Sequence, residues 1–219
     1  MIEAIVPLKS LALAKARLAS QLDDTDRQAL VSAMAQDVVA QLVRHPNIDV
    51  VSVVLGDGWD VSLFDGDSLR ALWEREWHGR DLNSALVGAI ERSTAERLLL
   101  VHGDLPWLGA ADLDEVLQAG ESVDVVLCPD RLQEGTNLVS FARVCGFSPQ
   151  FGTASRSRHI EAAHALGLTC AELQLPGTSS DVDTEEDMAT LAAESSGLGP
   201  AVVAWLGRHS GARASGESA

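Results

Sequence analysis

Residues 97–106 read Arg97-Leu-Leu-Leu-Val-His-Gly-Asp104-Leu-Pro106. The apolar run has the length of a buried strand, and it stops at a carboxylate and then at a proline, which cannot continue a strand ladder. Asp104 is therefore predicted to project from the carboxyl edge of a strand. A hard carboxylate oxygen there suits Mg²⁺, which usually keeps water and substrate phosphates as its other ligands. The alternative is an ordinary turn aspartate before a helix.

Similar runs on both sides of this stretch repeat the pattern. Apolar, β-branched runs recur at residues 2–6, 48–55, 123–128 and 168–175, and helical periodicity occurs at residues 26–43, 82–93, 110–119, 156–166 and 185–193. Alternating strands and helices imply a doubly wound, Rossmann-like α/β domain with one parallel-rich sheet. We predict this domain over residues 1–194, followed by a partly disordered C-terminal extension over residues 195–219 that contains a short helix at 201–206.

The charge balance excludes several kinds of partner. Sixteen Lys and Arg residues stand against 32 Asp and Glu residues, which gives a formal net charge of -16 at pH 7. Such a surface repels nucleic acids and anionic membranes, so we expect neither as a partner. No run approaches the roughly 20 apolar residues of a spanning helix. The N-terminus lacks the features of a signal peptide, and the expected location is cytoplasmic.

The lysines are concentrated in one place. The chain has only two, Lys9 and Lys15, and both follow the first predicted strand, where Arg17 joins them. Three cations in a loop at the carboxyl end of a parallel strand are typical of phosphate-binding sites in α/β folds. In an acidic protein they would attract a polyanion locally. The alternative is that two solvated lysines stand there by chance.

Two more carboxylates lie in the segment Ser180-Asp181-Val-Asp183-Thr184. In an extended segment, residues i and i+2 point to the same side, so Asp181 and Asp183 can face one site. Like charges about 4 Å apart repel by on the order of 4 kcal/mol at an effective dielectric constant near 20, so such a pair usually hosts a cation or holds a proton. The alternative is an acidic helix start capped by Asp183 or Thr184.

Two segments rich in small residues are candidate anion sites. Gly135-Thr136-Asn137 and Phe151-Gly152-Thr-Ala-Ser155 are predicted as loops that offer backbone N–H groups and hydroxyls. The second opens directly into a predicted helix, and the N-terminus of a helix attracts anions. Plain turns are the alternative for both.

Two further polar side chains lie close to these motifs. Asn83 opens the predicted helix at residues 82–93 and can hydrogen-bond a base or a ribose. The alternative at this helix start is simple capping by Asp81. His102, beside Asp104, is more typical of a core or rim histidine than of a catalyst.

The order and spacing of these motifs form one pattern across residues 2–193. Its parts are Pro7-Leu-Lys9, Ala14-Lys15-Ala-Arg17-Leu18, Asp81-Leu-Asn83, Gly103-Asp104-Leu-Pro106, Pro129-Asp130-Arg131, Gly135-Thr136-Asn137, Phe151-Gly152 with Ser155, Arg158-His159 and Asp181-Val-Asp183-Thr184. The pattern resembles the guanylyltransferases of coenzyme F420 biosynthesis. The resemblance implies a single GT-A-like domain with a mixed, mostly parallel sheet, the fold that sugar and molybdopterin nucleotidyltransferases share.

The resemblance also implies a reaction and residue roles. GMP would pass from GTP to the phosphate of 2-phospholactate, phosphoenolpyruvate or 3-phosphoglycerate, with pyrophosphate released and Mg²⁺ as the cofactor. The next enzyme of the pathway is an implied partner. By position, Asp104, Asp181 and Asp183 would hold Mg²⁺; Lys9, Lys15 and Arg17 would face the triphosphate; and Thr136, Gly152 and Ser155 would grip the acceptor, with Asn83 and Asn137 as further substrate-binding residues.

The chemistry needs no general base, because the acceptor's phosphate is already largely dianionic at pH 7, with a second pKa of about 6. A rival is a phosphatase of the haloacid dehalogenase type, since residues 181–184 match its DxDxT motif. That motif should follow the first strand, whereas here it lies near the C-terminus. Two further rivals are a nucleotidyltransferase that acts on a molybdopterin or a sugar phosphate, and a non-catalytic nucleotide-binding regulator.

Overall fold

Two neighbouring strands show why the sheet has a hydrophobic core on each of its two faces. In the computed structural model, β1 (Ile2–Leu8) and β4 (Arg97–Val101) lie side by side in parallel. Side chains alternate across them, so that Val6 packs into one core cluster and Ile5 into another on the opposite face. Both faces of the sheet must therefore be covered by helices. The structure describes residues 1–67, 69–73 and 81–216.

The described strands form one seven-stranded sheet in the order β3-β2-β1-β4-β6-β5-β7. The remaining strands are β2 (Val50–Leu55), β3 (Leu69–Trp73), β5 (Val125–Pro129), β6 (Thr136–Ala142) and β7 (Cys170–Glu172). Among these seven, β6 alone pairs antiparallel, with β4 and β5. The predicted mixed, mostly parallel sheet is thus confirmed. The strand order reverses between β1 and β4, and ligands of such sheets bind outside the carboxyl ends of the strands at that point.

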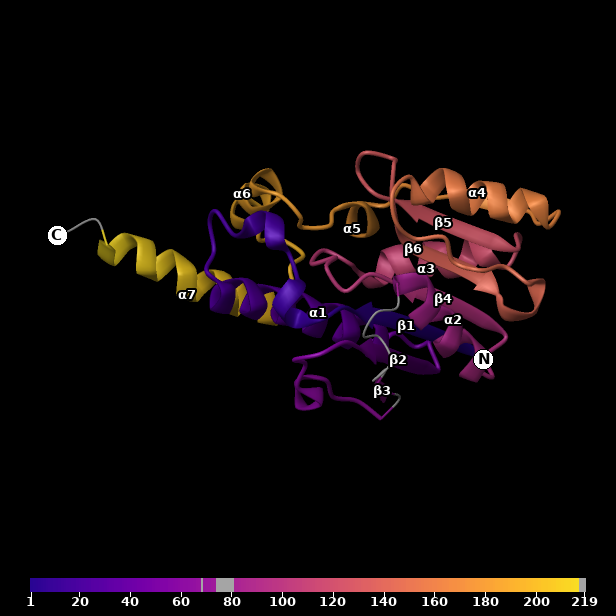
Figure 1. The fold of residues 1–219 in the computed structure, drawn as a ribbon, viewed down its shortest axis with the longest axis horizontal. Coiled ribbons are helices and arrows are strands. Elements are labelled where there is room, and N and C mark those ends of the chain that lie inside the picture. The colour runs from indigo at the N-terminus through magenta and orange to yellow at the C-terminus, as the bar shows by residue number, and fades with distance from the viewer. Residues whose placement is uncertain (68, 74–80, 217–219) are drawn as a thin grey trace.

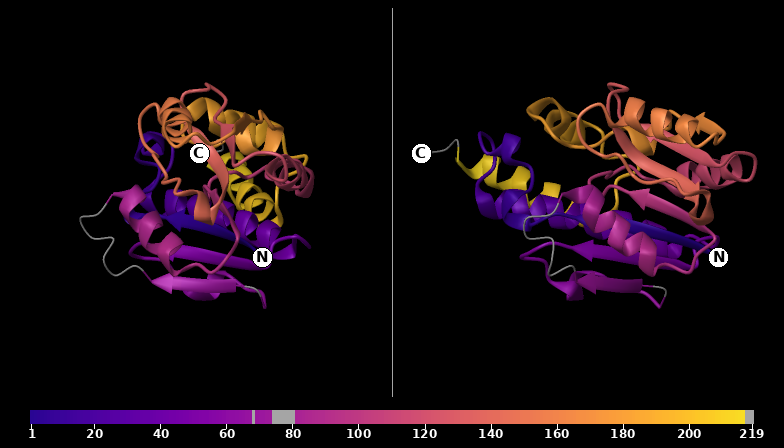
Figure 2. Two further views of the ribbon diagram at one scale, coloured as in Figure 1. Left: turned by 90° about the vertical axis from the view of Figure 1, so that its right-hand side faces the viewer. Right: turned by 45° about the vertical axis from the view of Figure 1, so that its right-hand side comes forward.

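Helices cover both faces of the sheet (Figures 1 and 2). One core cluster takes side chains from α1 (Asp24–Arg44), α3 (Ala110–Gly120), α6 (Glu185–Ala193) and α7 (Pro200–Gly216). The other takes them from α2 (Leu82–Arg92) and α4 (Ser155–Ala165). Short helical turns complete the fold: η1 (Leu11–Leu13), η2 (Ala16–Leu18), η3 (Val61–Leu63), η5 (Arg143–Cys145) and α5 (Pro176–Ser179).

The C-terminal helix α7 packs beside α1 (Figures 1 and 2). Val202 and Trp205 are buried against the core. The Asp37 carboxylate of α1 accepts hydrogen bonds from the N–H groups of Ala201 and Val202, at 3.0 and 2.9 Å, and so caps the start of α7. The predicted short helix at 201–206 is therefore the first part of a longer one. Residues 217–219 of the predicted extension lie outside the described residues.

Apart from the C-terminal one, the predicted helices begin and end within two residues of the observed ones, but two strands were not predicted. The sequence predicts a loop at residues 135–137, whereas β6 begins at Thr136. Ser140 interrupts the apolar run of β6 because it receives a hydrogen bond from Arg97 at 3.1 Å, which weakens the strand signal. The edge strand β3 was also missed. In the described part of the chain, no helix has the length and apolar character needed to cross a membrane.

Candidate active site

A cavity of about 410 Å³ lies outside the carboxyl ends of β1 and β4. Lys9 and Lys15 reach it from the loop after β1, and Asp104 from the loop after β4. The segment between α5 and α6 and the start of β6 complete its polar wall. The predicted site residues that line it are Lys9, Lys15, Asp104, Thr136, Asn137, Gly152, Ser155, Asp181 and Asp183.

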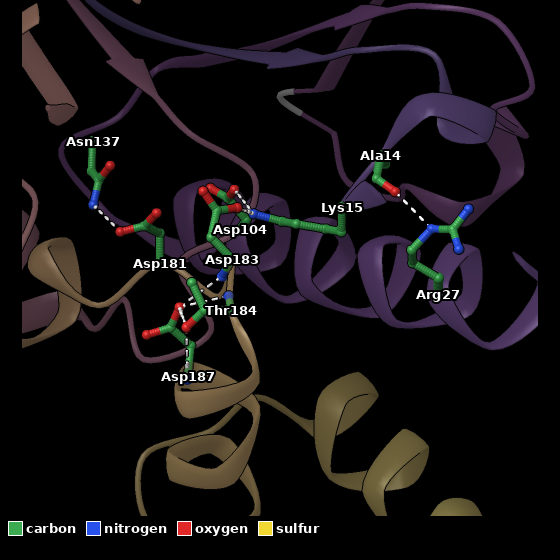
Figure 3. Close-up of polar contacts among 9 residues, drawn as sticks. All are labelled: Ala14, Lys15, Arg27, Asp104, Asn137, Asp181, Asp183, Thr184 and Asp187. Atoms are coloured by element: carbon green, nitrogen blue, oxygen red, sulfur yellow. Dashed lines mark hydrogen bonds and ion pairs between the residues drawn. The ribbon is translucent and has the colours of Figure 1, made fainter. Parts of the chain in front are cut away.

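Lys15 joins two of the carboxylates at one end of this cavity (Figure 3). Its Nζ atom donates a short hydrogen bond to Asp104 Oδ2 and another, of 2.5 Å, to Asp183 Oδ1. The Lys15 side chain is only 8% exposed. Burial opposes its charged form, but the two carboxylates hold the pKa of Lys15 above its ordinary value. The same ion pair outweighs the burial of Asp104 and holds the pKa of that carboxyl below its usual value.

Asp181 carries the third carboxylate and lies beyond this ion pair. Its Oδ1 atom accepts a hydrogen bond of 3.0 Å from Asn137 Nδ2 (Figure 3). The same Asn137 amide group also donates to the Thr178 carbonyl. Burial, and then the negative charge of Asp104, raise the pKa of Asp181 to about 6. A bound cation would remove this penalty. Asn137 thus contacts a predicted metal ligand rather than lying free for substrate.

The donor chemistry of this end fits Mg²⁺. Three carboxylates supply the hard oxygen ligands that the ion prefers, and Asp104 Oδ1 is buried without a hydrogen-bond partner among the described residues. In residues 1–67, 69–73 and 81–216, however, no three His, Cys, Asp or Glu side chains are arranged to hold a metal ion. The position between Asp104 and Asp183 is taken by the Lys15 ammonium group. Metal binding there requires that ammonium to withdraw.

The backbone around Lys15 is held in an uncommon conformation. Lys15 has φ 50° and ψ 43°, in the left-handed region that non-glycine residues seldom adopt. The carbonyl of Ala14 accepts a 2.9 Å hydrogen bond from Arg27 Nε on α1 (Figure 3). Arg27 is itself buried and pairs with Asp24 at 2.8 Å. Helix α1 therefore fixes the loop that carries Lys15.

Asp187 holds the segment that carries Asp183. Its Oδ2 atom accepts hydrogen bonds from the N–H groups of Asp183 and Thr184, at 3.0 and 2.8 Å, and from the Thr184 hydroxyl (Figure 3). Thr184 in turn caps α6 by accepting from Asp187 N–H. The helix start that the sequence offered as an alternative is therefore real. It coexists with the contact between Asp183 and Lys15.

The part of the cavity lined by Thr136, Gly152 and Ser155, here called its neutral end, offers uncharged donors, and the Asp130 carboxylate lines the cavity beside it, where it accepts from the Gly135 N–H at 2.9 Å. Thr136 on β6 and Ser155 at the start of α4 are each 2% exposed. Gly152 between them has φ 120°, a conformation that L side chains rarely adopt, so glycine is needed there. Neither the Ser155 hydroxyl nor the Gly152 N–H makes a hydrogen bond to any described residue. Both groups are therefore available to a ligand.

Two predicted site residues lie away from the cavity. The Asn83 side chain donates to the Phe151 carbonyl at 3.0 Å and accepts from the Phe151 N–H at 2.8 Å. Both ends of its amide are thereby used to hold the loop before Gly152, while Asp81 caps α2. Arg17 is exposed and does not line the cavity, because it points outward from the short turn η2. Lys9 lines the cavity but is exposed at its rim.

Three residues support this site through contacts that were not predicted from the sequence. They are Arg27, Asp187 and His159, which is buried behind Thr136 with Nδ1 3.0 Å from the Thr136 hydroxyl. The Thr184-x-x-Asp187 spacing of a capping box was a usable signal. Arg27 contacts a residue 13 positions away. His159 belongs to the sequence pattern with Arg158, but its contact with Thr136, 23 positions away, has no local signal.

Comparison with known proteins identifies the family. The sequence profile of the family described as "Guanylyl transferase CofC like" matches residues 2–198. A phosphoenolpyruvate guanylyltransferase from Sphaerobacter thermophilus is 33% identical over 86% of this chain and 91% of its own length. A 2-phospho-L-lactate guanylyltransferase from Methanothermobacter thermautotrophicus is also 33% identical, over 86% and 82%. A 3-phospho-D-glycerate guanylyltransferase from Phenylobacterium zucineum is 34% identical, over 88% and 90%.

Solved structures support the same fold. A nucleotidyl transferase from Methanothermobacter superposes with a TM-score of 0.62 at 16% identity, over 87% of this chain and 95% of that one. The 4-diphosphocytidyl-2C-methyl-D-erythritol synthase from Anaerococcus prevotii gives a TM-score of 0.60 at 12% identity, over 87% and 93%. At such identities the likeness concerns the fold alone. Together with the profile match and the relatives, it shows that this chain is an enzyme of the CofC-like guanylyl transferase family.

Proposed function

We propose that this guanylyl transferase moves GMP from GTP to the phosphate of a small phosphorylated carboxylic acid, using Mg²⁺ and releasing pyrophosphate. The observation that carries the proposal is one cavity that brings together a carboxylate–lysine cluster and three uncharged residues with hydrogen-bond donors, Thr136, Gly152 and Ser155. The acceptors named for the relatives, namely phosphoenolpyruvate, 2-phospho-L-lactate and 3-phospho-D-glycerate, are the proposed candidates. The proposed setting is coenzyme F420 biosynthesis in the cytoplasm, with the next enzyme of that pathway as a partner.

At the ionic end, Asp104, Asp181 and Asp183 are the residues that would hold Mg²⁺. When bound, Mg²⁺ would neutralise the GTP phosphates and stabilise the pyrophosphate that leaves. Lys15 then exchanges its carboxylate partners for phosphate oxygens and adds a positive charge at the reacting phosphates. Lys9, at the exposed rim, attracts the triphosphate into an otherwise acidic protein.

At the neutral end, Thr136, Gly152 and Ser155 are the residues that would hold the acceptor. Their hydroxyl and N–H groups suit a phosphate or carboxylate, because they donate hydrogen bonds to its oxygens. Being uncharged, these groups do not form ion pairs with the nearby aspartates, as a lysine or arginine would. The acceptor phosphate is a dianion near neutral pH and attacks without a base. In keeping with this, burial lowers the pKa of His102, which lines the cavity, and disfavours its charged form.

The rival functions have less support. Asp181 lies between α5 and α6 rather than after β1, so the first aspartate of its DxDxT sequence is not where a phosphatase nucleophile belongs. A molybdopterin or sugar-phosphate acceptor is not favoured by the names of the relatives. A regulator without turnover is less favoured because the matched family and the relatives are guanylyl transferases, and the cavity retains the buried lysine and three carboxylates.

The test is pyrophosphate release by the purified protein with GTP and Mg²⁺, with each of the three phospho-acids offered separately. We expect release with at least one of them, and a product whose mass equals that of the acceptor plus GMP minus water. A sugar phosphate serves as the control acceptor. Release with the sugar phosphate alone, or with none of the acceptors, would contradict the proposal.

A further inference from the structure

His159 lies directly behind the neutral end of the cavity. It is fully buried on α4, with the ring of Phe151 4.9 Å away edge-on and that of Phe147 at 5.8 Å. Each ring nitrogen has one partner: Nε2 lies 2.8 Å from the Gln150 backbone nitrogen, and Nδ1 lies 3.0 Å from Thr136 Oγ1. These two contacts determine where the protons are.

The contact with Gln150 selects one tautomer of His159. A backbone N–H is always a donor, so Nε2 must accept from it with its lone pair. A neutral imidazole with a bare Nε2 carries its proton on Nδ1, which then donates to the Thr136 hydroxyl. The other tautomer and the imidazolium ion would both press Nε2–H against the Gln150 N–H. Burial also lowers the pKa of His159 to about 4 and so keeps the ring neutral.

The tautomer fixes the direction of the Thr136 hydroxyl in turn. Because Thr136 Oγ1 accepts from His159, its own proton must point elsewhere. Thr136 lines the cavity, and its hydroxyl has no second hydrogen-bond partner among the described residues. The proton is therefore left for a ligand. Without His159 the hydroxyl would rotate and would present a lone pair as readily as a proton.

We propose that His159 is a positioning residue that holds the Thr136 hydroxyl as a hydrogen-bond donor toward an anionic oxygen of the acceptor. His159 does not touch the acceptor itself. The identity of the ligand rests on the proposed function, whereas the tautomer and the hydroxyl direction rest on the contacts with Gln150 and Thr136. The arrangement favours an acceptor with an anionic oxygen over one that offers a hydroxyl in the same place.

The first test needs no turnover. Long-range ¹H–¹⁵N spectra of the wild-type protein at pH 7 distinguish the two neutral tautomers from the imidazolium ion, and loss of the signal in His159→Gln assigns it. We expect Nδ1–H with an unprotonated Nε2. An Nε2–H tautomer, or an imidazolium ion, would overturn the proposal.

The second test is a double-mutant cycle on KM for the acceptor. Thr136→Val should raise this KM at least about tenfold, because a hydrogen bond to a charged group is lost, while Thr136→Ser should change it little. His159→Phe should raise it several-fold in the wild-type background but no more than about twofold in the Thr136→Val background. His159→Asn, whose amide can still donate to Thr136, should recover part of the loss.

Controls separate a positioning role from a merely structural one. KM for GTP should stay within about twofold in these variants, and His164→Gln, an exposed change on the same helix, should alter neither KM. Additive effects of the His159 and Thr136 changes, or a change confined to KM for GTP, would contradict the proposal. If His159→Phe does not fold, His159→Leu, which has no donor for Thr136, takes its place in the cycle. An Nδ1–H signal without guanylyl transfer to any acceptor would instead contradict the proposed function. It would still agree with the His159 tautomer and the direction of the Thr136 hydroxyl described above.

Discussion

The two ends of the cavity offer opposite chemistry to a ligand. At the ionic end, two carboxylates share one buried ammonium group, and burial and the charge of Asp104 raise the pKa of a third carboxyl, that of Asp181. At the neutral end, a hydroxyl fixed by a buried imidazole stands near a glycine and a serine with available donors. A charge cluster recognises phosphate wherever it lies, whereas fixed donors recognise the position of each oxygen. We infer that the first end supplies catalytic power and the second supplies acceptor selectivity.

The largest effect should come from breaking the ionic end. Asp104→Asn keeps the side chain's shape but removes a charge that pairs with Lys15 and would bind the metal, so guanylyl transfer should fall by at least about 10³-fold. Pyrophosphate release under saturating substrates measures this. The matched control is Asp67→Asn, an exposed aspartate outside the cavity, which should keep full activity. Activity within tenfold of the wild type in Asp104→Asn would argue against a metal site there.

A second change should separate two roles of Lys15. Lys15→Met removes a donor to the reacting phosphates, and turnover should fall by about 10²- to 10³-fold. The same change removes the ammonium that sits between Asp104 and Asp183, so the nucleotide-free protein should bind Mg²⁺ more tightly. Calorimetric titration with Mg²⁺ measures whether binding tightens while turnover falls, with Lys9→Met as the control. Equal or weaker Mg²⁺ binding in Lys15→Met would show that Lys15 does not occupy the metal position.

At the neutral end, His159 should make the free energy of unfolding depend on pH in the acid range. His159 has a pKa of about 4 in the folded protein against an ordinary 6.5, so the unfolded state takes up the proton first as the pH falls. The contribution of the neutral His159 side chain to the free energy of unfolding is complete above pH 6.5. As the pH falls toward 4, about 2 to 3 kcal/mol of this contribution is lost. Denaturant unfolding at pH 7 and pH 4.5 measures the difference. His159→Gln should lose this part of the pH dependence, and an unchanged dependence would contradict a neutral His159.

The smallest effect is expected for Arg17. Arg17→Gln should change kcat/KM for GTP by less than about twofold, because the side chain is exposed and lies off the cavity. Lys9→Gln, at the rim, should lower it several-fold at low salt and less at high salt. Steady-state kinetics at two ionic strengths compare the pair. A larger loss of kcat/KM in Arg17→Gln than in Lys9→Gln would support the predicted contact between Arg17 and the triphosphate.

The sequence predicts the ionic end better than the neutral one, for a physical reason. Lys15 and Asp104 follow strands whose carboxyl ends meet at one edge of a parallel sheet, so strand order alone brings them together. Asn83 shows where this reasoning fails. At the start of a helix, the direction of its amide depended on the Phe151 loop, which is distant in sequence.

The neutral end also depends on long-range contacts. His159 reaches Thr136 only because β6 inserts antiparallel between β4 and β5, and that pairing leaves no periodic signal in the sequence. Arg27 supports Lys15 through a backbone carbonyl, a contact that any residue at position 14 could make. Such supporting contacts become visible only in the folded chain.

Calorimetric titration of GTP in the presence of Mg²⁺, on Asp104→Asn and Thr136→Val in parallel, tests the division of the cavity most directly. The account predicts that Thr136→Val binds GTP as the wild type does, whereas Asp104→Asn loses the Mg²⁺-dependent part of the affinity. Retained Mg²⁺-dependent GTP binding in Asp104→Asn, together with its loss in Thr136→Val, would contradict it.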